Sequence, residues 1–349
     1  GAWGLSTGLI YAPSCYAETD EIVSLARVAA KHHGIYASHI RGEAETLLQA
    51  VREAIEIGER AKIPVEISHF KASGRKYWGM TTESLRLVEE ARARGVDVTV
   101  DQYPYIASST SLGALLPLWV HEGGTDKMLE CLKDPEIREK AKREPEVAER
   151  EWDQVKVVFA EKQPNFTGRS IHEIAKIQGK ELSDAVFDLL IEEEAGVSIV
   201  SFGMSEEDVR RVMRSPFMMV GTDGSAISPN GVLGRGKPHP RFYGTFPRIL
   251  GHYVNREKVL TLQEAVRKMT SMPAQKIGLR DRGLLREGMV ADIVIFDADE
   301  ILDQATFTDP HRFPKGIHYV IVKGTVVVGK NKHTGALPGK ALERTDYAS

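Results

Sequence analysis

The sequence has little cysteine, no long apolar run and no large excess of charge of one sign. Its two cysteines, Cys15 and Cys131, are too few for a disulfide framework, which fits a reducing cytoplasm. No apolar run approaches the ~18 residues of a membrane span, and no signal peptide is visible. A net charge of −3 gives no reason to expect nucleic acid or a membrane surface as a partner. We therefore expect a cytoplasmic protein without either partner, and an oligomer is left open.

The length and composition allow a large buried core. The chain has 349 residues, of which 42% are hydrophobic and 27% charged, which suits one large barrel-type domain or two smaller domains. The sequence starts at Gly1 without a methionine and runs directly into an apolar strand pattern. We expect an internal start, with an N-terminal portion absent.

Strand and helix patterns alternate over the first 110 residues at a spacing of roughly 30 residues. Apolar strand patterns cover residues 4–11, 35–39, 64–69 and 96–101, and helical patterns cover residues 19–31, 43–60 and 82–94. This alternation favours an α/β fold, a parallel sheet with helices packed outside it. A βα unit repeated with polar residues at the ends of its strands is typical of the active site of a (β/α) barrel.

The alternation breaks after residue 110. Residues 111–215 are highly charged and helical in pattern, and they predict an insert that is either a lid over the site or a device for oligomerisation or stability. Residues 216–284 predict the last barrel strand and further helices. Residues 285–349 predict a small β portion, with strands at 292–296, 318–322 and 325–328 and a hairpin turn at Lys323-Gly324.

Three polar side chains follow apolar strand patterns and could meet at one edge of the sheet. His39 and His69 each end a short strand, and Asp223 follows a later one. A lone histidine at a strand end is more often a satisfied polar residue, but two at equivalent ends favour a zinc site. Zinc lowers the pKa of a bound water to about 7, and a neighbouring carboxylate can move its proton. Asp223 is our candidate for that base, although an aspartate before Gly224 could also simply cap the loop.

Other polar residues near these strand ends could bind a substrate. Lys71 could balance a substrate charge or be a solvated surface lysine. Arg241 suits a carboxylate because its planar fork binds two oxygens, but surface arginines are common. Tyr103, Tyr105 and Ser109 could donate hydrogen bonds to a carbonyl or could pack the loop.

Eight segments of the sequence resemble a known family in the order in which that family has them. They are GLSTGLIY (4–11), SHIR (38–41), ISHFK (67–71), DQYPY (101–105), GTDG (221–224), HPRFYGTFPR (239–248), TSMPA (270–274) and GMVADIVIFD (288–297). Together they resemble the D-aminoacylase (N-acyl-D-amino-acid deacylase) family of the metal-dependent amidohydrolase superfamily. The resemblance implies a (β/α)8 TIM-type barrel, with a helical insert and a small C-terminal β-sandwich portion.

The resemblance also implies roles for single residues. His39 and His69 match zinc-binding histidines on barrel strands five and six, and Asp223 matches the general base on strand eight. Arg241 and Lys71 match residues that hold the carboxylate of the substrate. Tyr103, Ser109 and Tyr11 match residues that line the substrate pocket.

The sequence departs from the family pattern at its N-terminal side. The family has an Asp-x-His-x-His-type motif on strand one and a cysteine ligand on an early strand, and neither occurs here. We therefore expect a partial barrel that lacks strands one to three. The chain as it stands would offer zinc two histidines and Asp223, one or two ligands short of a tight site. The resemblance implies zinc as the cofactor, with one tight site and room for a second, weak one.

The expected activity is zinc-dependent hydrolysis of the amide bond of N-acyl-D-amino acids, small-molecule substrates that yield a carboxylate and a D-amino acid. Two alternatives stay open. One is a cyclic-amide hydrolase of the dihydroorotase or hydantoinase kind, although the carboxylate-binding arginine expected at position 241 argues against a simple hydantoin. The other is a truncated, non-catalytic paralogue.

Overall fold

A parallel sheet with helices on one face forms the N-terminal part of the molecule. The computed structural model describes residues 1–344. The sheet has the order β1-β2-β3-β4-β8, and all four pairings are parallel. Its strands are β1 (Gly4–Gly8), β2 (Ile35–His39), β3 (Val65–Ile67), β4 (Val98–Gln102) and β8 (Met218–Val220). The predicted α/β architecture with a parallel sheet is confirmed.

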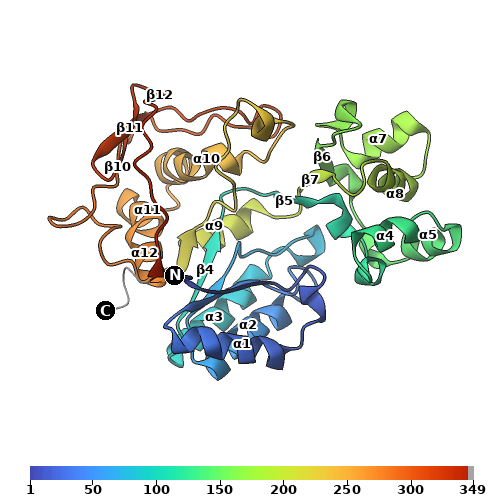
Figure 1. Cartoon of the computed structure of the whole chain (residues 1–349), viewed down its shortest axis with the longest axis horizontal. Helices are drawn as coiled ribbons and strands as arrows, with labels where there is room; N and C mark the ends of the chain where they lie inside the picture. Colours follow the sequence, from blue (N-terminus) through green and yellow to red (C-terminus); the bar gives the residue numbers. More distant parts are fainter. Residues whose placement is uncertain (345–349) are drawn as a thin grey trace.

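The outer face of this sheet is covered by amphipathic helices (Figure 1). The helices are α1 (Thr19–Lys31), α2 (Leu47–Ala61), α3 (Thr81–Ala93) and α9 (Glu206–Arg214). Val65, Ile67, Val98 and Val100 point toward them and join one apolar core. Because side chains alternate along a strand, the residues between them point to the opposite face. Register pairs Ala37 with Glu66 and Glu66 with Thr99 on that inner face.

The insert between β4 and β8 has a core of its own. Its helices are α4 (Thr125–Cys131), α5 (Pro135–Lys142), α6 (Pro145–Ala148), α7 (Ile171–Gln178) and α8 (Leu182–Glu192). The sequence predicts helices alone, but the structure adds an antiparallel sheet in the order β5-β7-β6, formed by β5 (Ser108–Ser111), β6 (Val155–Phe159) and β7 (Ser198–Ser201). These strands are only four or five residues long, too short to show a clear period of two among the charged helices.

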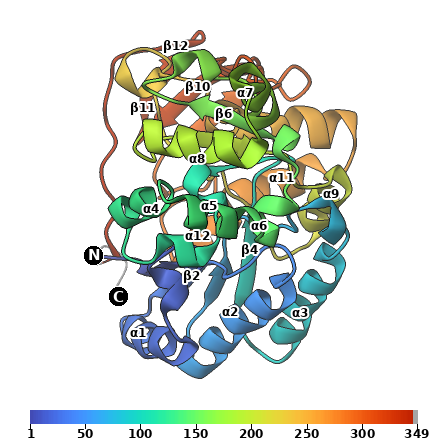
Figure 2. The same cartoon turned by 90° about the vertical axis from the view of Figure 1, so that its right-hand side faces the viewer.

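The last part of the chain contains helices followed by a small sheet. The helices are α10 (Arg241–Arg248), the π-helix η8 (Ile249–Arg256), α11 (Leu262–Met269) and α12 (Ser271–Ile277). An antiparallel sheet in the order β12-β11-β10-β9 follows, with β9 (Ile293–Phe296), β10 (Ile317–Val322), β11 (Thr325–Gly329) and β12 (Lys332–His333). Figure 1 places this sheet and the insert on opposite sides of the molecule, and Figure 2 views the insert face-on. The short 3₁₀ turns are Ser14–Tyr16, Arg75–Tyr77, Leu112–Leu115, Leu118–His121, Trp152–Gln154, Pro164–Phe166 and Val232–Gly234.

Two sequence expectations about this part of the molecule are not supported as they were made. The helix predicted at residues 43–60 begins only at Leu47, so residues 43–46 belong to the loop after β2. The expectation of a partial barrel that lacks strands one to three is not supported by the structure: in the described residues the parallel sheet has five strands, and nothing shows that others are missing.

Candidate metal and substrate site

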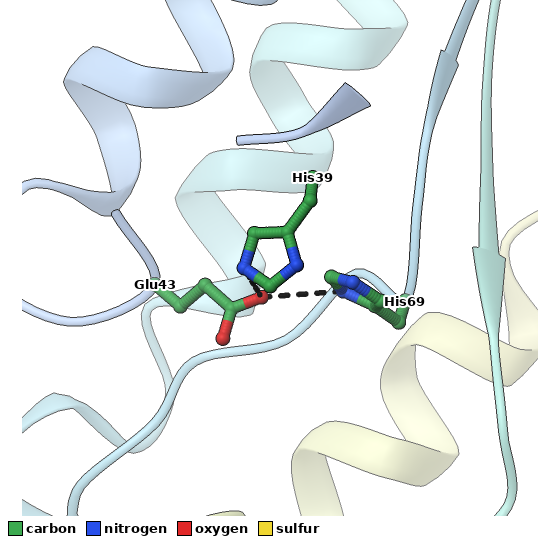
Figure 3. A group of neighbouring side chains, drawn as sticks. All are labelled: His39, Glu43 and His69. Carbon is green, nitrogen blue, oxygen red and sulfur yellow. Dashed lines mark ion pairs between the residues drawn. The ribbon is translucent and has the colours of Figure 1, made fainter. Parts of the chain in front are cut away.

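Two histidines and a glutamate meet at the carboxyl ends of β2 and β3 (Figure 3). His39 is the last residue of β2, and His69 lies two residues after β3. Their ring centroids are 4.2 Å apart. Glu43 Oε1 lies 3.5 Å from His39 Nε2 and 3.2 Å from His69 Nδ1. One ligand atom from each of the three residues falls within 4.8 Å of the others, so the cluster brings together the two histidines predicted from the sequence and adds Glu43.

Sequence reasoning missed Glu43 because it assigned the residue to the first turn of a helix. In the structure, Glu43 lies in the βα loop, where its backbone carbonyl accepts a hydrogen bond of 2.7 Å from Ser73 N. Arg41 fixes the start of this loop through two bonds to Glu53, of 2.9 and 2.8 Å. The sequence signal that could have pointed to Glu43 is its position, four residues after a histidine that ends a strand.

Lys71 lies within the same cluster. Its Nζ donates to Glu43 Oε1 at 2.5 Å and lies 2.8 Å from both His69 Nδ1 and His69 O. The side chain is 5% exposed, so the ammonium is buried beside its counter-ion. Burial lowers the pKa of Lys71, but the Glu43 carboxylate outweighs that effect and holds the pKa above its usual value.

The surroundings set the charge states of His39 and Glu43. Burial lowers the pKa of His39 to about 3, although Glu43 opposes the shift. For Glu43, burial opposes ionisation, but Lys71 and the two imidazoles outweigh it and hold the pKa below its ordinary range. Near neutral pH His39 is therefore a neutral imidazole, the form that binds metals, and Glu43 is a carboxylate.

Asp101, in β4, supports the backbone of His69. The Asp101 Oδ1 atom accepts a hydrogen bond of 2.8 Å from His69 N, and the Asp101 carbonyl accepts one of 2.7 Å from Phe70 N. His69 has a φ of 38°, a left-handed conformation that is unfavourable without such support. A Cβ atom on Gly221 would lie 2.6 Å from Asp101 Oδ1, so the loop after β8 depends on glycine at this position.

Asp223 and Arg241 form a second group of charges. Arg241 Nη1 lies 2.8 Å from Asp223 Oδ2, and the arginine side chain is 5% exposed while that of the aspartate is 42% exposed. The Arg241 guanidinium carbon lies 4.6 Å from the centre of the Tyr103 ring, and Lys71 Nζ lies 5.9 Å from the same ring. Tyr103 is therefore near both Lys71 and Arg241. The three-residue metal cluster contains Glu43 and does not include Asp223.

Tyr11 and Ser109 lie near the border of this site. The Tyr11 ring is 5.0 Å from the His39 ring, and its hydroxyl lies 3.2 Å from Thr110 Oγ1. Ser109 Oγ donates to the carbonyl of Ile199 at 2.9 Å. Ser109 is thus engaged with the neighbouring strand β7, whereas Tyr11 packs directly against a predicted metal ligand.

The donor set fits a zinc ion. Two imidazoles and a carboxylate are ligands that zinc prefers, and His39 Nε2 is a buried nitrogen without a hydrogen-bond partner. A buried polar atom that lacks a partner within the protein is expected where an ion or substrate completes the site.

Comparison with known families agrees with this geometry. The profile of the family described as "Amidohydrolase family" matches residues 2–328. The chain belongs to the amidohydrolase family. This confirms the resemblance seen in the sequence.

The curated proteins that are similar over nearly the whole chain include deacylases. The chain is 36% identical over 345 residues to a D-aminoacylase of Alcaligenes xylosoxydans xylosoxydans, covering 99% of this chain and 62% of that protein. It is 37% identical to an N-acyl-D-glutamate deacylase of the same organism, with coverages of 99% and 61%. The chain thus spans about three fifths of the length of these relatives.

The solved structures that are similar to this chain also include deacylases. An N-acyl-D-glutamate deacylase of Bordetella bronchiseptica, complexed with zinc and a phosphonate that mimics the tetrahedral intermediate, is 33% identical with a TM-score of 0.78. The match covers 95% of this chain and 61% of that chain. A D-hydantoinase at 16% identity and a TM-score of 0.50, with coverages of 96% and 66%, shares the fold alone. Within residues 1–344, no helix is both long and apolar enough to span a membrane.

Proposed function

We propose that this chain carries the zinc-binding and substrate-binding residues of an enzyme that hydrolyses the amide bond of N-acyl-D-amino acids. The main support is the geometry of the site. A zinc-type cluster with its neighbour Lys71 and a buried arginine lie near the same tyrosine ring, Tyr103, and a substrate with both an amide and a carboxylate requires both groups. The deacylase relatives, similar over nearly the whole chain, support the same reaction.

The proposed metal residues are His39 and His69, with Glu43 as a third ligand. Asp223 remains a proposed ligand and base, because its loop starts at the carboxyl end of β8, on the same edge of the sheet. When bound, zinc would polarise the substrate carbonyl and make a water molecule more acidic. The site is proposed for one tight ion and a second, weaker one.

The protein side chains orient the substrate and move the proton. Arg241, held over the Tyr103 ring, is proposed to bind the α-carboxylate through two nitrogen atoms. Lys71 adds positive charge to the same pocket, partly neutralised by Glu43. Asp223 would accept the proton of the attacking water and pass it to the leaving nitrogen. Tyr103, Ser109 and Tyr11 are proposed to contact the substrate.

We also propose that β1 to β4 and β8 are strands four to eight of a (β/α)8 barrel. The support is their unbroken parallel order and family membership. The proposed units are residues 1–110 and 216–284 for the barrel, 111–215 for the insert and 285–349 for a β-sandwich portion. The cytoplasm is the proposed location, which the two free cysteines fit.

The decisive test uses three substrates with zinc-loaded protein. We expect turnover of N-acetyl-D-methionine, at least tenfold slower turnover of N-acetyl-L-methionine, and none of a simple hydantoin. Zinc content is measured in parallel by plasma mass spectrometry. Preferred hydantoin turnover would favour the cyclic-amide alternative. If the protein neither bound zinc nor hydrolysed any of the three substrates, the result would favour a non-catalytic paralogue.

A further inference from the structure

His239 lies outside the metal cluster but contacts Arg241 directly. Its side chain is 1% exposed, and both of its ring nitrogens have a backbone partner. The backbone amide of Arg241 donates to His239 Nδ1 at 3.0 Å. On the other side of the ring, His239 Nε2 lies 2.9 Å from the carbonyl oxygen of Ala107.

These two contacts define the tautomer of the ring. A backbone N–H can only donate, so Nδ1 must be the acceptor and carries no proton. The proton is therefore on Nε2, from which it is donated to the Ala107 carbonyl. Burial, reinforced by the positive charge of Arg241, lowers the pKa of His239 well below its usual value. The ring is neutral wherever the protein is folded near neutral pH.

His239 connects the two walls of the proposed substrate pocket. Ala107 lies directly before β5, the strand that carries Ser109, and Arg241 is the first residue of α10. Three aromatic rings surround the imidazole at centroid distances of 6.0 Å (Tyr103), 5.1 Å (Tyr105) and 4.9 Å (Phe307). The imidazole has little room to rotate, so the distance between the two backbone segments is fixed by the ring itself.

We propose that His239, as the neutral imidazole protonated on Nε2, is a positioning residue. It holds the start of α10 against residues 107–109, so that the Arg241 guanidinium faces the carboxylate of the substrate. The inference rests on the proposed function, because it assumes that Arg241 binds this carboxylate. It adds that the geometry of Arg241 is set by a side chain that does not touch the substrate.

The first test examines the wild-type protein without any substrate. Nitrogen-15 NMR of labelled histidine distinguishes a protonated from an unprotonated ring nitrogen, and the His239→Asn variant assigns the signal. We expect the Nε2-protonated form of His239 to persist unchanged from pH 8 to pH 5.5. A ring protonated on Nδ1, or one that titrates near pH 6.5, would overturn the proposal.

The second test separates positioning from general stability. We compare KM and kcat for N-acetyl-D-methionine and for its carboxamide, which lacks the carboxylate, in His239→Phe and His239→Asn. Phenylalanine removes both ring hydrogen bonds, whereas asparagine retains an acceptor for the Arg241 amide. Since a displacement of about 1 Å can cost about 100-fold, we expect a loss of about that size in kcat/KM for the acid in the Phe variant. The loss should be smaller in the Asn variant, and the carboxamide should be little affected.

Two controls distinguish the possible failures. His172→Gln changes an exposed histidine on α7 and should leave kcat/KM unchanged for both substrates. Arg241→Gln tests the proposed function itself, because it should abolish the preference for the acid over the carboxamide. Suppose that Arg241→Gln abolishes this preference. The inference about His239 is then wrong if the His239 variants retain the preference, or if their kcat/KM falls equally for the acid and the carboxamide. If Arg241→Gln retains the preference, the proposed role of Arg241 is wrong instead.

Discussion

At the scale of single residues, the sequence predicted that His39 and His69 lie together, but not that Glu43 contacts both. His39 and His69 could be predicted because each ends an apolar strand, and parallel strands bring their carboxyl ends to one edge. Glu43 could not, because its role depends on where α2 begins, and helix starts are uncertain by a few residues. The pairing of Lys71 with Glu43 is a contact between two loops that no local pattern encodes. The ion pair of Asp223 with Arg241 is likewise a contact between distant segments that no local pattern predicts.

Glu43 provides the sharpest residue-scale prediction. We expect Glu43→Gln to destabilise the protein by about 3–5 kcal/mol, because it leaves the buried ammonium of Lys71 without a counter-ion. The double variant Glu43→Gln/Lys71→Met should recover most of this stability, since both charges are removed together. Its zinc affinity should nevertheless stay at least tenfold below wild type, because a carboxylate ligand is lost. Urea unfolding and zinc titration against a chelating dye measure the two effects. Wild-type zinc affinity in the double variant would exclude Glu43 as a ligand.

At the scale of elements, the parallel sheet with its outer helices was predictable, but the contacts that support the loop of His69 were not. Alternating patterns place helices and parallel strands correctly, because each parallel strand buries an outer face against helices. The contact from Asp101 to His69 joins β4 to the loop after β3, and it depends on Gly221 after β8. His69 and Gly221 are 152 residues apart in the chain, so sequence periodicity carries no information about contacts among these three segments.

We expect Asp101→Ala to lower zinc affinity by about 10- to 100-fold, the usual cost of losing a partner that orients a metal ligand. Asp101→Asn retains an oxygen that can accept the His69 N–H, so its loss should be smaller. Gly221→Ala should resemble Asp101→Ala, because the added methyl displaces the Asp101 carboxylate. Thr99→Val is the matched control: it lies on the same strand and face but bonds to Glu66. Equal zinc affinity in Asp101→Ala and Thr99→Val would contradict the supporting role.

At the scale of the whole molecule, the described residues contain two large and separate apolar cores. One lies between the parallel sheet and its helices, and the other lies within the insert. The sequence suggested this division, because the strand–helix alternation stops near residue 110 and resumes near residue 216. It could not show that the insert encloses its own sheet. Separate cores are expected to unfold as partly independent units.

A pair of core substitutions tests this division. Phe187, on α8, is fully buried in the insert, and Ile67, on β3, is fully buried two residues before His69. We expect Phe187→Ala to destabilise its unit by about 3–5 kcal/mol and to speed hydrogen exchange in β6, β7 and α8, with zinc affinity unchanged. Ile67→Ala, at a cost of about 2–5 kcal/mol, should speed exchange in the parallel sheet and weaken zinc binding. Hydrogen exchange measured by mass spectrometry distinguishes the effects of the two substitutions. If Phe187→Ala increased exchange equally in β2, β3 and the insert, the molecule would unfold as one unit, and the insert would be part of the structure that supports the metal site.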